Sequence, residues 1–205
     1  MELYHIHKLN EHDESYEEGI ILYPGSEFNK MHERSLENTT SYIASIREKN
    51  GISYRYRTPF TDYLEKKLKR KNTSDEEYNS MINFIQVYMY NSAIDFREMI
   101  LEEVRREFYP TLPSRYSCIW LTDEECLEYW KKQLNVKDKY EIFKVEAIGN
   151  IFVSRDFLLP GIHLPHGSMY KLAHGYWNPS EENLRNVKDK EYLFEGELKL
   201  IKRIK

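Results

Sequence analysis

The sequence predicts an α+β fold: one domain, residues 1–205, whose sheet is split along the chain. Residues 3–9 alternate between two faces with the period of two that marks a β-strand. Helical patterns then dominate, and strand-like runs return only near the middle of the chain. We therefore expect three parts: a first strand region at 1–28, a large helical insertion at 29–112, and the strand-rich half of the core at 113–205.

The composition is typical of an ordinary globular protein. A chain of 205 residues, 40% hydrophobic and 31% charged with both signs interspersed, can bury one sizeable core beneath a mixed surface. The net charge of −4 argues against wholesale binding to nucleic acid. The first residues lack a basic and an apolar leader region, and no run approaches the roughly 18 apolar residues of a membrane span. We expect a soluble, cytoplasmic protein.

Two residue types add detail. Cys118 and Cys126 are the only cysteines, and both have hydrophobic neighbours, which predicts two reduced, partly buried thiols and no disulfide. Tyrosine is unusually frequent, with 17 residues against 9 Phe. Because Tyr combines an apolar ring with a polar tip, this excess suits partly wet clefts as well as cores.

The first strand carries two histidines on one face. Leu3, His5, His7 and Leu9 alternate with residues of the opposite face, so both imidazoles point to the same side. Two such histidines could be metal ligands, but no compact third ligand accompanies them, and we expect no metal. A short apolar strand or extended piece follows at residues 19–25 and ends in a Pro-Gly turn.

The helical insertion contains one strong helix. Residues 74–77 (Ser-Asp-Glu-Glu) form a capping box, and apolar residues then recur at helical spacing up to Phe108, which predicts a long core-facing helix ended by Pro110. Weaker helices are predicted at 29–50 and 62–70. The basic run at 66–71 is either a solvated helix end or a contact for a nucleic-acid backbone.

Strands and short helices alternate in the last third of the chain. The expected elements are a strand at 116–121, a helix from a capping box at 122–125 through residue 134, a strand at 140–148 turning at Gly149-Asn150 into 151–154, a helix at 168–177, and a closing strand or hairpin at 192–204.

Familiar catalytic motifs are missing from the sequence. It contains no phosphate loop, no Gly-rich dinucleotide fingerprint, no HExxH and no paired CxxC. What remains is an ordered pattern: Pro113-Ser-Arg115, a strand through Ser117 and Trp120, an acidic helix, Ala173-His-Gly-Tyr-Trp, and a last strand led by Glu191. In this order the chain resembles a bacterial family of unknown function, and it is similar to the ADP-ribosyltransferase fold.

The resemblance implies a split-sheet ADP-ribosyltransferase-like core that uses NAD as a substrate. It implies that His5 on the first strand bonds a ribose hydroxyl and that Glu191 stabilises the oxocarbenium-like state formed when the nicotinamide bond breaks. These two residues are the predicted catalytic pair, expected to meet in one cleft. The implied acceptor of ADP-ribose is a macromolecule, either protein or nucleic acid.

The resemblance also implies a set of NAD-binding residues. Aromatic rings would stack against the nicotinamide, and a guanidinium would bind the pyrophosphate through paired hydrogen bonds. The candidates for binding NAD are His5, Arg115, Tyr116, Ser117, Trp120 and Tyr176.

Several of these residues also have a structural explanation. Arg115 could pair with an acidic neighbour, Tyr176 and Trp177 could be a core aromatic pair, and Glu195 or Glu197 could replace Glu191. Two other functions remain open on the same sequence. One is a non-catalytic protein-interaction domain that uses the helical insertion, and the other is a toxin or antiphage factor that acts on nucleic acid.

Overall fold

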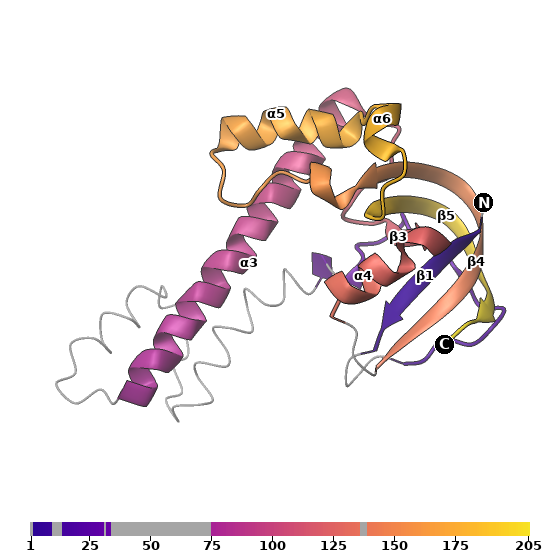
Figure 1. The fold of residues 1–205 in the computed structure, drawn as a ribbon, viewed down its shortest axis with the longest axis horizontal. Helices are drawn as coiled ribbons and strands as arrows, with labels where there is room; N and C mark the ends of the chain where they lie inside the picture. Colours follow the sequence, from indigo (N-terminus) through magenta and orange to yellow (C-terminus); the bar gives the residue numbers. More distant parts are fainter. Residues whose placement is uncertain (1, 10–13, 31, 34–74, 136–138) are drawn as a thin grey trace. The chain divides into compact units, whose positions relative to one another are not determined.

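A computed structural model describes residues 2–9, 14–30, 32–33, 75–135 and 139–205 of the chain (Figure 1). Two compact units are present: Met1–Lys30 with Arg97–Lys205, called the core unit here, and Met31–Phe96. Helix α3, Asp75–Phe108, contributes residues to both units. The helices predicted at 29–50 and 62–70, the capping box at Ser74 and the basic run at 66–71 fall wholly or largely outside the described residues.

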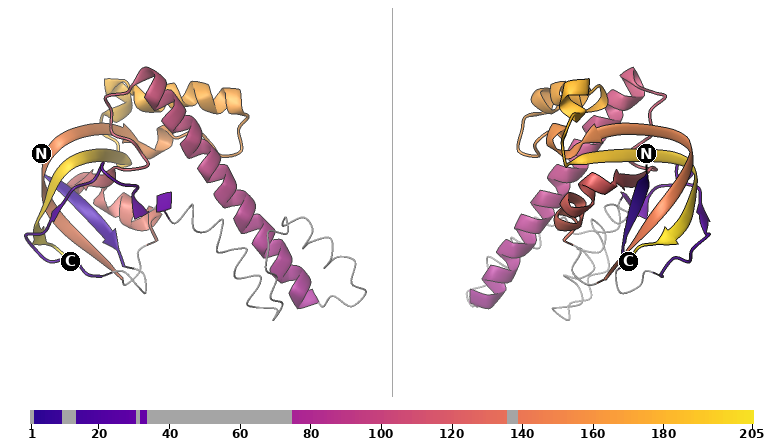
Figure 2. Two further views of the ribbon diagram at one scale, coloured as in Figure 1. Left: turned by 180° about the vertical axis from the view of Figure 1, so that it is seen from behind. Right: turned by 45° about the vertical axis from the view of Figure 1, so that its right-hand side comes forward.

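The core unit is built on a five-stranded antiparallel sheet, which establishes a mixed α and β fold. The strands are β1 (Leu3–Lys8), β2 (Ile21–Leu22), β3 (Ile119–Asp123), β4 (Tyr140–Arg155) and β5 (Lys190–Arg203). Their order is β2-β5-β3-β1-β4, and β4 also pairs with β5. Four strands therefore form a closed ring, and Figure 2 shows the long strands β4 and β5 curving together. The first strand lies among the last ones, as predicted.

The helices of the core unit largely match the predicted ones. Besides the end of α3, they are α4 (Leu127–Gln133), α5 (His166–Trp177) and the unpredicted α6 (Glu181–Leu184). The predicted cap at Thr122 is one residue too early: Asp123 caps the turn before α4, and its Oδ1 accepts from the Cys126 amide at 3.0 Å. Thr122 is instead part of β3, opposite Tyr4. None of the described helices has the length and apolarity needed to cross a membrane.

The hairpin predicted at Gly149-Asn150 is wrong, because β4 runs unbroken from Tyr140 to Arg155. Gly149 lies opposite Gly196 of β5. A Cβ atom added to Gly149 would lie 2.3 Å from the carbonyl oxygen of Glu195, a distance that no real side chain tolerates. The glycine at this position therefore serves the close approach of two curved strands instead of a turn.

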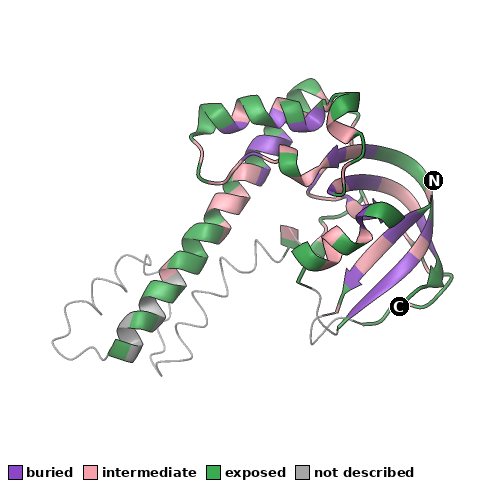
Figure 3. Ribbon diagram, in the orientation of Figure 1, coloured by how far each residue is buried: buried purple, intermediate pink, exposed green. Residues whose placement is uncertain are grey.

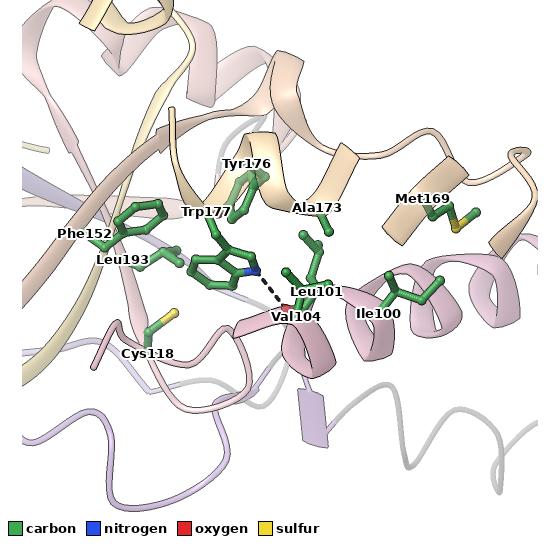
Figure 4. Close-up of a cluster of buried hydrophobic side chains, with 10 residues drawn as sticks. All are labelled: Ile100, Leu101, Val104, Cys118, Phe152, Met169, Ala173, Tyr176, Trp177 and Leu193. Carbon is green, nitrogen blue, oxygen red and sulfur yellow. Dashed lines mark hydrogen bonds between the residues drawn. The ribbon is translucent and has the colours of Figure 1, made fainter. Parts of the chain in front are cut away.

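The sheet has two differently covered faces. The inner face encloses one hydrophobic cluster, which consists of Leu3, Leu121, Phe143, Val145, Tyr192, Phe194, Leu198 and Leu200. The outer face packs through Phe152 and Leu193 against α5 and the last turns of α3 (Figure 4). There the indole Nε1 of Trp177 donates to the carbonyl oxygen of Leu101 at 2.7 Å.

Among the residues of α3 whose burial the structure describes, the buried ones lie in the C-terminal turns (Figure 3). Ile100 and Val104, two of the predicted core positions, are almost fully buried, whereas Phe108 at the helix end is 48% exposed. The core-facing prediction is therefore confirmed at Ile100 and Val104. It is wrong at four other predicted core positions, which are at least 36% exposed: Ile82, Tyr88, Met89 and Phe96. Cys118 and Cys126 are both buried free thiols, as predicted.

Candidate functional site

Four polar side chains from four segments meet at the outer face of the sheet, where α5 and the end of α3 cover it. They are Glu98 on α3, Arg115 in the segment between α3 and β3, Tyr176 on α5 and Glu191 on β5, and we call them the Arg115 cluster. All four are buried, with exposed fractions between 0% and 6%. Arg115 Nε donates to Glu98 Oε2 at 2.6 Å, and Arg115 Nη1 donates to Glu191 Oε1 at 3.0 Å. The cluster thus joins both carboxylates to one guanidinium.

Electrostatics keep Arg115 and Glu98 ionised. Burial by itself lowers the pKa of Arg115, but Glu98, Tyr176 and Glu191 outweigh it and hold the pKa well above the ordinary value. Burial raises the pKa of Glu98, but the charges and hydrogen bonds of Arg115 and Arg97 lower it by more. The net shift of this pKa is therefore downward. Both groups therefore carry their charges at neutral pH.

Tyr176 links the guanidinium to the second carboxylate. Its hydroxyl oxygen lies 2.5 Å from Arg115 Nη1 and 2.6 Å from Glu191 Oε1. Burial, together with the charge of Glu191, raises the pKa of the Tyr176 phenol well above its ordinary value despite the opposing effect of Arg115. The phenol is therefore neutral, and its single proton is available to the carboxylate.

A second carboxylate on β5 holds the segment that carries Arg115. Glu195 Oε1 accepts from the Ser114 amide at 2.9 Å and from Ser117 Oγ at 2.8 Å. Ser114 Oγ in turn donates to Glu102 on α3 at 3.0 Å. Because Glu191 and Glu195 are four residues apart on one strand, they share its outer face.

The predicted stacking residues have different surroundings. The Trp120 ring centre lies 5.7 Å from the Arg115 guanidinium carbon, and the Tyr176 ring centre lies 5.1 Å from it, so both rings flank the same cation. Tyr116 instead lines a groove of about 480 Å³ along α3, together with Met99, Glu102, Glu103, Arg106 and Glu107. The structure therefore brings two of the three aromatic candidates to Arg115.

His5 lies on the inner face of the sheet. It is paired with Phe143 of the inner cluster, and its Nδ1 is 3.1 Å from the Trp120 carbonyl oxygen. A carbonyl oxygen can only accept, so Nδ1 carries the proton. Burial lowers the pKa of His5 to about 4, more than the bond to Trp120 raises it. His5 is thus a neutral imidazole that fastens β1 to β3.

The expectation that His5 and Glu191 meet in one cleft is not met by this arrangement. Tyr192 belongs to the inner cluster, and neighbouring residues of a strand point to opposite faces, so Glu191 points outward. His5 points inward with Phe143. Arg115, Tyr176 and Glu191 are brought together, whereas His5 reaches this group only through the Trp120 backbone.

His5 makes stability depend on pH in a predictable way. Its folded pKa of about 4 lies below the ordinary 6.5, so the unfolded chain binds the proton more readily, and stability falls as pH falls between these values. Between pH 7 and pH 4 we expect this residue to lower the unfolding free energy of the wild-type protein by about 3 kcal/mol. His5→Asn, which keeps a donor and removes the titration, should show a flatter dependence in urea unfolding at several pH values. The exposed His163→Asn is the control, and an unchanged slope in His5→Asn would contradict the prediction.

Glu98 is the member of the cluster that sequence reasoning missed. It lies within the helical insertion, which the resemblance does not cover. A signal was nevertheless present: Glu98 precedes the buried Leu101 by three residues and so lies on the apolar face of α3. A carboxylate at such a position predicts a buried cation, and Arg115 fills that role. The alternative in which Arg115 pairs with acidic neighbours is therefore what the structure contains.

Comparison with known proteins gives a family and no activity. No curated protein matches the chain. The model of a family described as a protein of unknown function, DUF2441, matches residues 3–205. The chain therefore belongs to the DUF2441 family.

Proposed function

We propose that the protein is an ADP-ribosyltransferase-like enzyme that cleaves NAD and transfers ADP-ribose to a macromolecular acceptor. One observation supports this proposal most: the three segments that carry the resemblance are neighbours in the sheet. The strand led by Glu191 pairs with the strand of Trp120, which pairs with the strand of His5. Segments from the two ends and the middle of the chain are thus adjacent strands of one sheet, the arrangement that the resemblance implies.

Glu191 supplies the central chemistry of the proposed reaction. The bond between ribose and nicotinamide breaks, its electron pair leaves with nicotinamide, and positive charge develops on the ribose. A carboxylate at the ribose lowers the energy of that state. The acceptor then attacks the ribose carbon and releases its proton to solvent. Glu191 is 2% exposed beneath α5 and α3, so the proposal requires this cover to open for NAD.

His5 takes a different part from the one that the resemblance implies. Because its side chain points to the inner face, it acts in this proposal through the Trp120 carbonyl oxygen, which it holds at 3.1 Å. This bond fixes the position of β3 relative to β1, and with it the ring of Trp120 beside Arg115.

A second candidate is a non-catalytic protein-interaction domain. It is favoured by the opposite orientation of His5 and Glu191 and by the burial of the whole Arg115 cluster, which also suits a structural core. In that case the cluster serves only to join α3, α5 and β5.

Nicotinamide release separates the two candidates. Purified protein is incubated with labelled NAD and cell extract, and the protein and RNA fractions are then analysed separately for label. We expect release by wild type and a decrease of about 100-fold in Glu191→Gln. Glu197→Gln on the same strand is the matched control and should retain wild-type turnover. Thermal unfolding of each variant shows whether it is folded.

The alternative outcomes are equally informative. If Glu195→Gln lost nicotinamide release while Glu191→Gln kept full turnover, the catalytic carboxylate would be Glu195. Absence of release by the folded wild-type protein would overturn the enzymatic proposal and favour the interaction domain.

A further inference from the structure

The donors of Arg115 are divided between two carboxylates. On one side, Nε and Nη2 reach the two oxygens of Glu98 at 2.6 and 3.5 Å. On the other side, Nη1 reaches both Tyr176 Oη and Glu191 Oε1. The first pair of bonds fixes the guanidinium on α3, so the second pair has a defined direction.

Tyr176 is held in a single orientation from both of its ends. Its carbonyl oxygen accepts from Ser154 Oγ on β4 at 2.8 Å, which ties the end of α5 to the sheet. At its other end the phenol oxygen accepts from Arg115, so its one proton is directed to Glu191. These bonds fix the positions of the Tyr176 carbonyl and of its hydroxyl group.

The two bonds to Glu191 leave its carboxylate asymmetric. Oε1 accepts from both Arg115 and Tyr176. No donor in the described part of the chain forms a hydrogen bond to Oε2, although the side chain is only 3% exposed. A purely structural ion pair would gain from a partner on both oxygens. The arrangement instead orients one oxygen and leaves the other available.

We infer that Arg115 and Tyr176 are positioning residues, which hold Glu191 by Oε1 so that Oε2 faces the reacting ribose. This inference rests on the proposed function and assigns neither residue a contact with NAD. The resemblance implies that Arg115 binds the pyrophosphate and that Tyr176 stacks on the nicotinamide. In this inference both residues instead orient the Glu191 carboxylate.

The test compares two variants of neighbouring buried residues. Tyr176→Phe removes the hydroxyl and keeps the ring, whereas Trp177→Phe removes the indole donor to Leu101 and leaves Glu191 untouched. For nicotinamide release, Tyr176→Phe should lower kcat about 10- to 100-fold with KM for NAD within about 2-fold. Trp177→Phe should retain kcat within about 3-fold at a comparable loss of thermal stability. Arg115→Lys, which keeps the charge and loses the fork of donors, should behave like Tyr176→Phe.

A double mutant shows whether Tyr176 acts through Glu191. In the Glu191→Gln background, Tyr176→Phe should cause no further decrease of kcat. If the two residues acted independently, the fold-decreases in kcat of the two single variants would multiply in the double mutant. Equal kcat values for Tyr176→Phe and Trp177→Phe, or additive losses in the double mutant, would overturn the inference while leaving the proposed function intact. No release by wild type would overturn both.

Discussion

Arg115→Met should lower the free energy of unfolding by about 4 kcal/mol. Methionine preserves much of the volume but removes the one cation, among the residues that the structure describes, that contacts both Glu98 and Glu191. Two carboxylates then remain buried, and Glu98 keeps its two hydrogen bonds from the partly exposed Arg97. Urea unfolding followed by circular dichroism at neutral pH measures the loss.

A matched variant distinguishes the buried cluster from an ordinary ion pair. Arg155 pairs with Asp189 at 3.0 Å, but its side chain is 20% exposed. Arg155→Met should therefore lower the unfolding free energy by only about 1 kcal/mol. Because Arg115 lowers the pKa of Glu98 against the effect of burial, the penalty of Arg115→Met should also decrease toward acid pH, where Glu98 takes up a proton. Equal losses in the two variants would contradict the account.

Gly149→Ala should lower the free energy of unfolding by about 3 kcal/mol, although it adds one methyl group. The new Cβ would lie 2.3 Å from the Glu195 carbonyl oxygen and 2.9 Å from the Gly196 Cα, and both are backbone atoms that cannot turn aside. Relief requires β4 and β5 to separate where Gly149 lies opposite Gly196, next to Glu195. The same urea measurement applies.

The matched control is a glycine with room around it. Gly175 lies within α5, and nothing stands within 4 Å of a Cβ added there. Gly175→Ala should therefore be neutral or stabilise the protein by up to about 1 kcal/mol, since alanine favours a helix. A loss below about 1 kcal/mol in Gly149→Ala would mean that the two strands tolerate a wider spacing than the structure has.

Local patterns were sufficient to predict several elements of the core unit. The alternation from Leu3 onward predicts β1, because a period of two suits only an extended chain. Helical spacing and the prolines after Phe108 predict α3 and its end. These signals act over a few residues, so a sequence read alone contains them.

The hairpin at Gly149 shows where local reading fails. Gly-Asn is a strong turn signal when only the neighbours in sequence are considered. Here the decisive neighbour is Gly196, far along the chain, whose backbone lies opposite in β5. No local pattern reports how closely two distant strands approach.

The site divides in the same way between sequence and structure. The sequence by itself determined which residues of each strand share a face, and it singled out His5, Arg115, Tyr176 and Glu191 as candidates. Only the tertiary structure decided which strand faces lie on the same side of the sheet. The register between β5, β3 and β1 determines which residues of neighbouring strands are opposite each other and so share a side. That register turns His5 inward and Glu191 outward, and long-range packing of α3 and α5 brings Glu98, Arg115 and Tyr176 to Glu191.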